Sequence, residues 1–169
     1  MGTGTGTEAA RTVPVRVGAL LVAGGRVCLI RRRRGGGEQD TVPGGLVGAG
    51  EGERAALLRE LREELGLVLA AGVLAPVPHF EQEQATVRPV DGRVFRRRHL
   101  LWAVDLPPDA ADRTSAVELD DPGGTEVVWL PVPRARGVHL YPDVGAVLGA
   151  TPGPGTRRLP PVGDSYRWR

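Results

Sequence analysis

Two runs of apolar residues lie near the start of the chain and are separated by Gly24-Gly25. Residues 13–23 and 26–32 are rich in β-branched and aliphatic side chains, which is typical of strands. Two adjacent glycines can both adopt the positive φ of a type I′ turn. The pattern therefore predicts a β-hairpin, followed by a polar loop over residues 31–40 and a short strand over residues 41–43.

A helical pattern follows a glycine-rich loop. Within residues 53–65, Leu58, Leu61 and Leu65 recur at helical spacing, and alanines with high helix propensity lie between them. Gly66 is placed to adopt the left-handed conformation that ends many helices. We expect one amphipathic helix whose leucines pack on a sheet.

Further strand-like runs follow this helix, and a short helix is predicted late in the chain. Strands, one central helix and more strands predict an α/β fold, a sandwich with a mixed β-sheet. The expected strands span residues 68–77, 94–105 and 126–130, the loop between the last two spans residues 106–124, and the late helix spans residues 143–148.

The length of 169 residues predicts a single domain. Residues 1–11 form a Gly/Thr-rich stretch that is typical of a flexible tail. Residues 151–169 are rich in proline and glycine, which predicts an irregular C-terminal tail. The folded domain is accordingly expected over residues 12–150.

Charge and cysteine content exclude several classes of protein. All 22 basic residues are arginines, and the net charge of +2 does not predict nucleic-acid binding. The one cysteine, Cys28, cannot form an intrachain disulfide and is expected in the core. No apolar run reaches membrane-spanning length, and the N-terminus does not resemble a signal peptide. A cytoplasmic protein without a membrane partner is expected.

Acidic residues share one face of the predicted helix. Glu60, Glu63 and Glu64 are related by three and four positions, so like charges lie next to one another. This arrangement costs a few tenths of a kcal/mol per pair, and a hard divalent cation such as Mg²⁺ would offset the cost. Arg59 stands four residues before Glu63 and could orient a carboxylate by a forked hydrogen bond.

Glycines lead directly into this acidic helix. Gly45, then Glu51, then the run from Arg59 to Leu67 matches the pattern G-x5-E-x7-R-E-U-x-E-E-x-G-U at every specified position. The chain therefore resembles the Nudix hydrolase family over residues 45–67. The resemblance implies a Nudix-like α/β/α sandwich around a mixed β-sheet.

The resemblance also implies roles for the matching residues. Glu60, Glu63 and Glu64 would bind Mg²⁺, for which Mn²⁺ can substitute, and a backbone carbonyl of Gly44 or Gly45 would complete the metal site. Arg59 would orient the glutamates, and Glu60 or a neighbour would deprotonate the attacking water. The catalytic residues expected on this basis are Glu60, Arg59 and Glu63, and Glu51 would hold the junction between loop and helix.

The implied reaction is hydrolysis of a pyrophosphate bond in a nucleotide, either a nucleoside triphosphate or a small nucleoside diphosphate derivative. Arg31, Arg33 and Arg97, from two arginine clusters, are candidate substrate-binding residues. Gly48 stands where many family members carry a glutamate, which implies one metal contact fewer. Homodimers are frequent in the family.

Two questions stay open at the level of sequence. Some members use a downstream acid as a further ligand or base, for which Glu81, Glu83, Glu118, Asp120 and Asp121 are all candidates. The alternative functions are a non-catalytic nucleotide-binding regulator with the same fold and a basic nucleic-acid-binding protein. The intact set of glutamates favours the hydrolase.

Overall fold

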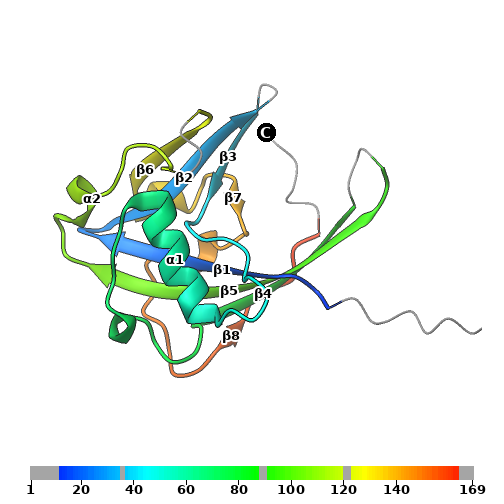
Figure 1. Cartoon of the computed structure of the whole chain (residues 1–169). Helices are drawn as coiled ribbons and strands as arrows, with labels where there is room; N and C mark the ends of the chain where they lie inside the picture. The colour runs from blue at the N-terminus through cyan, green and yellow to red at the C-terminus, as the bar shows by residue number, and fades with distance from the viewer. Residues whose placement is uncertain (1–11, 35–36, 88–90, 120–122, 164–169) are drawn as a thin grey trace, which may run out of the picture.

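The computed structural model describes residues 12–34, 37–87, 91–119 and 123–163. A strongly bent sheet dominates these regions, and one long helix lies across it (Figure 1). The strands are β1 (Val15–Ala23), β2 (Arg26–Arg34), β3 (Gly37–Thr41), β4 (Phe80–Val87), β5 (Val94–Leu106), β6 (Thr125–Pro131), β7 (Leu140–Tyr141) and β8 (Arg157–Arg158). The helices are α1 (Glu53–Leu65), α2 (Ala110–Arg113) and α3 (Val132–Ala135), with the 3₁₀ helices η1 (Ala71–Val73) and η2 (Gly145–Val147).

The sheet is mixed, as the sequence predicted. Its strand order is β7-β3-β2-β1-β5-β4-β8, and β6 pairs with β2 outside this path. β1 runs parallel to β5 along its whole length, whereas β1 meets β2 only next to the hairpin turn. Gly24 and Gly25 have φ values of 54° and 73°, which confirms the predicted turn.

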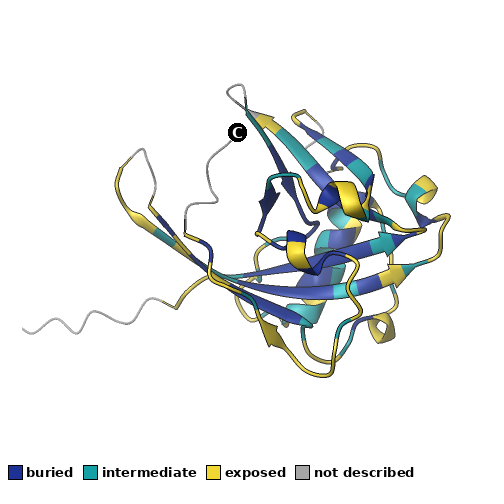
Figure 2. Ribbon diagram, turned by 180° about the vertical axis from the view of Figure 1, so that it is seen from behind, coloured by how far each residue is buried: buried dark blue, intermediate teal, exposed yellow. Residues whose placement is uncertain are grey.

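Two hydrophobic cores lie on opposite faces of the sheet. α1 packs Leu57, Leu61 and Leu65 onto one face, where Trp102 and Leu100 of β5 are also buried. The other face is covered by the chain around α3, β7 and η2. The buried residues form a band through the centre of the molecule, and the strand tips are exposed (Figure 2). Layers on both sides of a mixed sheet confirm the predicted α/β sandwich.

The central helix has the predicted bounds but a slightly rotated buried face. Leu57, Leu61 and Leu65 are fully buried, whereas Leu58 is only half-buried. Leu58 still packs against this core, as predicted, and Leu57 is a further member of the stripe that the sequence did not assign. Gly66 ends the helix at φ 67° and donates its N–H to carbonyls of the last turn, as expected.

Two predicted segments differ from the structure. The expected loop over residues 31–40 is instead an extension of β2 and most of β3, because cross-strand partners order a polar stretch. The expected strand over residues 68–77 is a loop with the short helix η1. The antiparallel partner of β5 is β4, over residues 80–87, where no strand was predicted.

The last described residues are mostly irregular, yet they also join the sheet. β8 pairs in parallel with β4, and Val162 forms a further bridge to Gln84. Residues 1–11 and the end of the chain after Gly163 lie outside the described regions, so the expected N-terminal tail is not described. Cys28 is buried and free, as predicted. In the described residues, no helix combines the length and hydropathy needed to cross a membrane.

Candidate functional site

The loop before α1 runs along the free edge of β1. Backbone hydrogen bonds join Val17 N–H to the Gly45 carbonyl at 2.9 Å and Ala19 N–H to the Pro43 carbonyl at 2.9 Å. Gly44 lies between these contacts with φ 136°, and a Cβ at this position would overlap the Val17 carbonyl oxygen. Only glycine permits this close approach, which brings the loop directly against the sheet.

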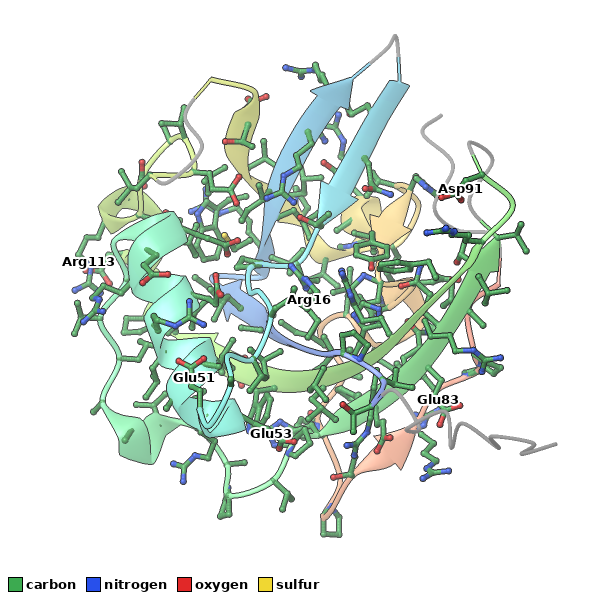
Figure 3. The ribbon with its side chains drawn as sticks, turned by 45° about the vertical axis from the view of Figure 1, so that its right-hand side comes forward. Arg16, Glu51, Glu53, Glu83, Asp91 and Arg113 are labelled. Atoms are coloured by element: carbon green, nitrogen blue, oxygen red, sulfur yellow. The ribbon has the colours of Figure 1, made fainter. Side chains whose placement is uncertain are left out.

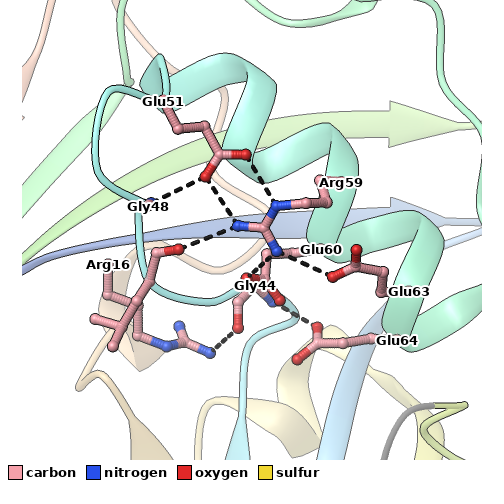
Figure 4. A network of polar contacts seen from close by, with 9 residues as sticks. Arg16, Gly44, Gly48, Glu51, Arg59, Glu60, Glu63 and Glu64 are labelled. Carbon is pink, nitrogen blue, oxygen red and sulfur yellow. Dashed lines mark hydrogen bonds and ion pairs between the residues drawn. The ribbon is translucent and has the colours of Figure 1, made fainter.

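Arg59 joins the acidic residues of loop and helix (Figure 4). Its Nε and Nη2 donate to the two carboxylate oxygens of Glu51, each at 2.9 Å. Its Nη1 donates to Glu60 Oε1 at 2.8 Å and to Glu63 Oε2 at 2.9 Å. One guanidinium therefore holds three carboxylates, and it also donates to the carbonyl of Leu46.

Glu51 fixes the start of the helix relative to the loop. Its Oε2 accepts a further hydrogen bond from the backbone N–H of Gly48 at 2.9 Å. Hydrogen bonds from Arg59 and from Gly48 lower the pKa of Glu51 to about 2. Glu51 thereby joins the loop at Gly48 to Arg59 of the helix.

Glu60 lies against the glycine loop. A Cβ on Gly45 would overlap the Glu60 carboxylate, so the absence of a side chain there makes room for this anion. Glu60 and Glu63 share the Nη1 group of Arg59 and therefore lie side by side at the loop. The Gly44 carbonyl accepts a hydrogen bond from Arg16, and the Gly45 carbonyl accepts one from the N–H of Val17.

Glu64 is the buried member of the acidic set. Its side chain accepts the backbone N–H of Gly44 at 2.7 Å, and the residue is 3% exposed. Burial raises the pKa of Glu64, and the neighbouring Glu118 carboxyl raises it further, whereas Arg16 and the Gly44 N–H oppose this. The helix therefore turns Glu64 inward, although it shares a face with Glu60, which is partly exposed.

Glu118 is the downstream acid that the structure brings to this site. It is 2% exposed, and Arg32 Nη2 lies 2.5 Å from its Oε1. Its Oε2 has no hydrogen-bond partner among the described residues. The loop that carries Glu118 is tied to α1, because Leu119 N–H donates to the Glu64 carbonyl at 2.9 Å.

The other downstream acids are placed differently. Glu81 forms an ion pair with Arg98 at 2.7 Å, and Glu83 is exposed on the β4–β5 arm (Figure 3). Asp120 and Asp121 lie outside the described residues. Of the candidates that the structure describes, Glu118 alone is close enough to shift the pKa of Glu64.

The residues of this site fit a hard divalent cation by their chemistry. Two buried carboxylates, Glu64 and Glu118, lie next to each other, and one oxygen of Glu118 is buried without a hydrogen-bond partner in the part of the chain that the structure describes. Such a pair is costly unless a cation compensates it, and carboxylate and carbonyl oxygens are the donors that Mg²⁺ prefers. As the described side chains stand, no three acidic, His or Cys groups gather at ligand distance, since Arg59 holds Glu60 and Glu63.

Arg16 is a site residue that the sequence analysis missed. Its Nη2 donates to the Gly44 carbonyl at 2.6 Å and to the Val42 carbonyl at 3.1 Å, so it supports the loop from below. It lies in the interior of the molecule (Figure 3) and is only 6% exposed. An arginine near the start of an otherwise apolar strand was the available signal, because a buried cation needs specific partners.

The three arginines expected to bind substrate have different surroundings. Arg31 forms hydrogen bonds with Asp40 at 2.9 and 3.1 Å. Arg33 is exposed and pairs with carboxylates of β3 and β6. Arg97 is half-buried and contacts Tyr141 and Phe95. Arg97 is thus the one of the three without a carboxylate at ion-pair distance among the described residues.

Solved structures of other proteins have the same fold as this chain. The MutT protein from Bacillus halodurans superposes with a TM-score of 0.58 at 13% identity, covering 89% of this chain and 91% of that chain. The ORF135 protein of E. coli gives a TM-score of 0.54 at 24% identity, covering 82% of this chain and 87% of that one. At these identities the likeness concerns the fold alone.

Sequence comparison adds a relative and a family model. The protein named "Putative 8-oxo-dGTP diphosphatase 2" in Mycobacterium tuberculosis is 72% identical over 98 residues, which are 55% of this chain and 62% of that protein. The match thus spans less than two thirds of the relative's length. The model of the NUDIX domain matches residues 12–145, which is most of the chain. The chain therefore belongs to the Nudix family.

Proposed function

We propose that this protein is a divalent-metal-dependent hydrolase that splits a pyrophosphate bond in a nucleotide. One observation carries the proposal: Arg59 gathers Glu51, Glu60 and Glu63 at the glycine loop, while Glu64 is anchored to the same loop from inside. Membership of the Nudix family and the name of the mycobacterial relative support it.

In this proposal the metal ligands are Glu60, Glu63, Glu64 and a carbonyl of Gly44 or Gly45. Mg²⁺ or Mn²⁺, when bound, would polarise the phosphate oxygens and lower the pKa of a coordinated water. Arg16 and the Gly44 N–H hold the loop and Glu64 in place, whereas Glu60 and Glu63 would turn from Arg59 toward the ion when it binds. Glu118 would add a further negative charge next to Glu64.

The proton of the attacking water needs an acceptor at the same place. Glu60 Oε1 is held by Arg59, which leaves Oε2 of that carboxylate to take the proton. The water oxygen bonds to one phosphorus, the bridging phosphorus–oxygen bond breaks, and the second phosphate leaves. For a nucleoside triphosphate the products are the nucleoside monophosphate and pyrophosphate.

The substrate is proposed to be a nucleoside triphosphate or a small nucleoside diphosphate derivative. The mycobacterial relative's name makes 8-oxo-dGTP the first compound to assay. Arg31 and Arg33 already compensate carboxylates of the protein, so Arg97 is the arginine best placed to meet the substrate. Purified protein should be assayed with Mg²⁺ and with Mn²⁺ against 8-oxo-dGTP, dGTP, ADP-ribose and a dinucleotide, with products separated by chromatography.

Substitution of the acidic residues tests the mechanism. Glu63→Gln and Glu64→Gln remove a charge at almost constant shape, and each should lower kcat by about 100-fold or more because a ligand of the ion is lost. Glu83→Gln, an exposed glutamate of β4, is the matched control and should leave kcat unchanged. Full turnover in both site variants would refute the assignment. Tight nucleotide binding without turnover by the wild type would instead support the non-catalytic regulator.

A further inference from the structure

A planar cation and an aromatic ring lie together on the face of β5 opposite α1. The guanidinium carbon of Arg97 is 4.5 Å from the centre of the Phe95 ring, a distance typical of cation–π stacking. Both residues are half-buried. Arg97 Nε is buried and has no hydrogen-bond partner among the described residues, so the guanidinium keeps a donor that is not used within this part of the chain.

Tyr141 holds Arg97 in place, and Gln84 and His99 in turn hold Tyr141. Arg97 Nη1 donates to the Tyr141 hydroxyl at 3.2 Å, and that hydroxyl donates to Gln84 Oε1 at 2.8 Å. His99 Nε2 lies 3.0 Å from the same Gln84 oxygen, and its ring meets the Tyr141 ring edge-on at 5.2 Å. These contacts join β4, β5 and β7 into one polar network, which restricts the guanidinium plane.

His99 is uncharged within this network. Burial, together with the charges of Arg16 and Arg97, lowers the pKa of His99 to about 3. Because Gln84 Oε1 is an acceptor, the proton of the neutral ring lies on Nε2. The positive charge of this face therefore comes from the two arginines and stays constant at physiological pH.

The network continues to the acidic site through Arg16. Arg16 is the cross-strand partner of His99, and its guanidinium binds the Gly44 carbonyl. Polar side chains thus extend on one face of the sheet from the glycine loop to the Arg97–Phe95 stack. A nucleotide with its phosphates at the loop would extend its base along the same face.

We propose that the Arg97–Phe95 stack is a platform on which the base of the nucleotide lies, and that Tyr141 and Gln84 position it. This inference rests on the proposed function for the location of the phosphates. Guanidinium planes and aromatic rings both stack on bases. The ligand class is a nucleobase attached to a phosphate, so a phosphate compound without a base should not need this platform.

Equilibrium binding tests the platform without requiring turnover. Isothermal titration calorimetry with dGMP and with inorganic pyrophosphate, both in Mg²⁺, should be run on the full chain. Phe95→Leu and Arg97→Gln should raise the Kd of dGMP by about 10-fold and change that of pyrophosphate by less than about 2-fold. Tyr141→Phe should raise the Kd of dGMP by a smaller factor, because the ring remains while the hydrogen bond to Arg97 is lost.

Two controls separate stacking from charge. Arg97→Lys keeps the charge but not the plane, so it should bind dGMP as weakly as Arg97→Gln. Arg96→Gln makes the same charge change at an exposed neighbour on the opposite face of β5, and it should bind both ligands like the wild type.

Several outcomes would overturn the platform. One is that Arg97→Lys binds dGMP as tightly as the wild type does. A second is that the variants lose affinity for dGMP and for pyrophosphate by the same factor. A third is that the wild type does not bind dGMP. If the wild type hydrolyses no nucleotide but the platform variants weaken dGMP binding and not pyrophosphate binding, the proposed activity is refuted and the platform is supported. If the wild type hydrolyses nucleotides but Phe95→Leu binds dGMP as the wild type does, the platform is refuted and the proposed activity is supported.

Discussion

Gly44 and Gly45 are adjacent, but the structure requires each of them for a different reason. At Gly44 a side chain would meet the backbone of β1, and φ is 136°, a value that other residues rarely adopt. At Gly45 a side chain would meet only the end of Glu60, which is flexible. The first glycine therefore supports the fold, and the second makes room for a carboxylate of the site.

Alanine substitutions should separate these two requirements. Gly45→Ala should keep its Tm within a few degrees of the wild type, because Glu60 can swing away, but kcat should fall by about 10-fold or more. Gly44→Ala should lower the free energy of unfolding by about 1–3 kcal/mol, because backbone strain and overlap both act. Thermal melts and nucleotide hydrolysis measure the two effects. A Gly45→Ala protein with full activity would contradict the placement of Glu60.

The depressed pKa of Glu51 makes a prediction about acid stability. A carboxylate whose pKa falls from 4.5 unfolded to about 2 folded stabilises the protein above pH 4.5, and this stabilisation is lost as the pH falls toward 2. Glu51→Gln should therefore melt below the wild type at pH 7, and the difference in Tm should shrink between pH 5 and pH 2. Melts in EDTA exclude a contribution from metal. A difference in Tm that stays constant with pH would rule out this source of stability.

At the scale of elements, α1 has two functions at once. Its buried leucines hold it on β1 and β5, and the same helix presents Glu60, Glu63 and Glu64 to the loop that pairs with β1. The positions of the loop and of the helix are thus both fixed by their contacts with β1. A shift of the helix on the sheet would separate the carboxylates from the loop by the same amount.

Truncation of the helix core should therefore affect stability and activity together. Leu61 is fully buried, and Leu61→Ala should lower the free energy of unfolding by about 2–5 kcal/mol. Arg62→Ala, on the exposed side of the same helix, should change it by less than about 0.5 kcal/mol. Urea unfolding gives both values. We also expect Leu61→Ala to lower kcat at temperatures where it is still folded, and unchanged kcat there would argue against coupling between packing and site geometry.

At the scale of the whole molecule, the proposed metal site joins segments that are distant in sequence. The glycine loop, α1 and the loop with Glu118 meet at Glu64, and Arg16 of β1 lies beneath them. An ion bound there would hold these segments together only in the folded state. Ligands that bind only the folded state raise stability by mass action.

Divalent cations should accordingly stabilise the fold. Saturation at 100 times the dissociation constant should add about 2.7 kcal/mol to the free energy of unfolding. The Tm should rise with Mg²⁺ or Mn²⁺ concentration and return to the baseline in EDTA. Glu64→Gln should abolish most of the rise, whereas Glu83→Gln should retain it. An equal rise in both variants would indicate non-specific ion binding.

Periodicity and spacing were sufficient for the features that depend on neighbours along the chain. The hairpin at Gly24-Gly25 and the helix over residues 53–65 were both predicted, because turn conformation and helical repeat are local properties. The acidic set was also predicted, since positions three and four apart share a helix face regardless of the rest of the fold. Family membership followed from the same short segment.

Long-range contacts decided what local patterns did not contain. β3 and β4 form because polar residues are ordered by partner strands, which no local repeat reveals. Burial of Glu64 depends on which way the helix packs, and the choice of Glu118 depends on a loop that returns to α1 from over 50 residues away. The contact of Arg16 with Gly44 joins a strand to the glycine loop, and that of Arg97 with Tyr141 joins two strands. Their energies arise only when the sheet brings those strands together, so tertiary structure alone could assign them.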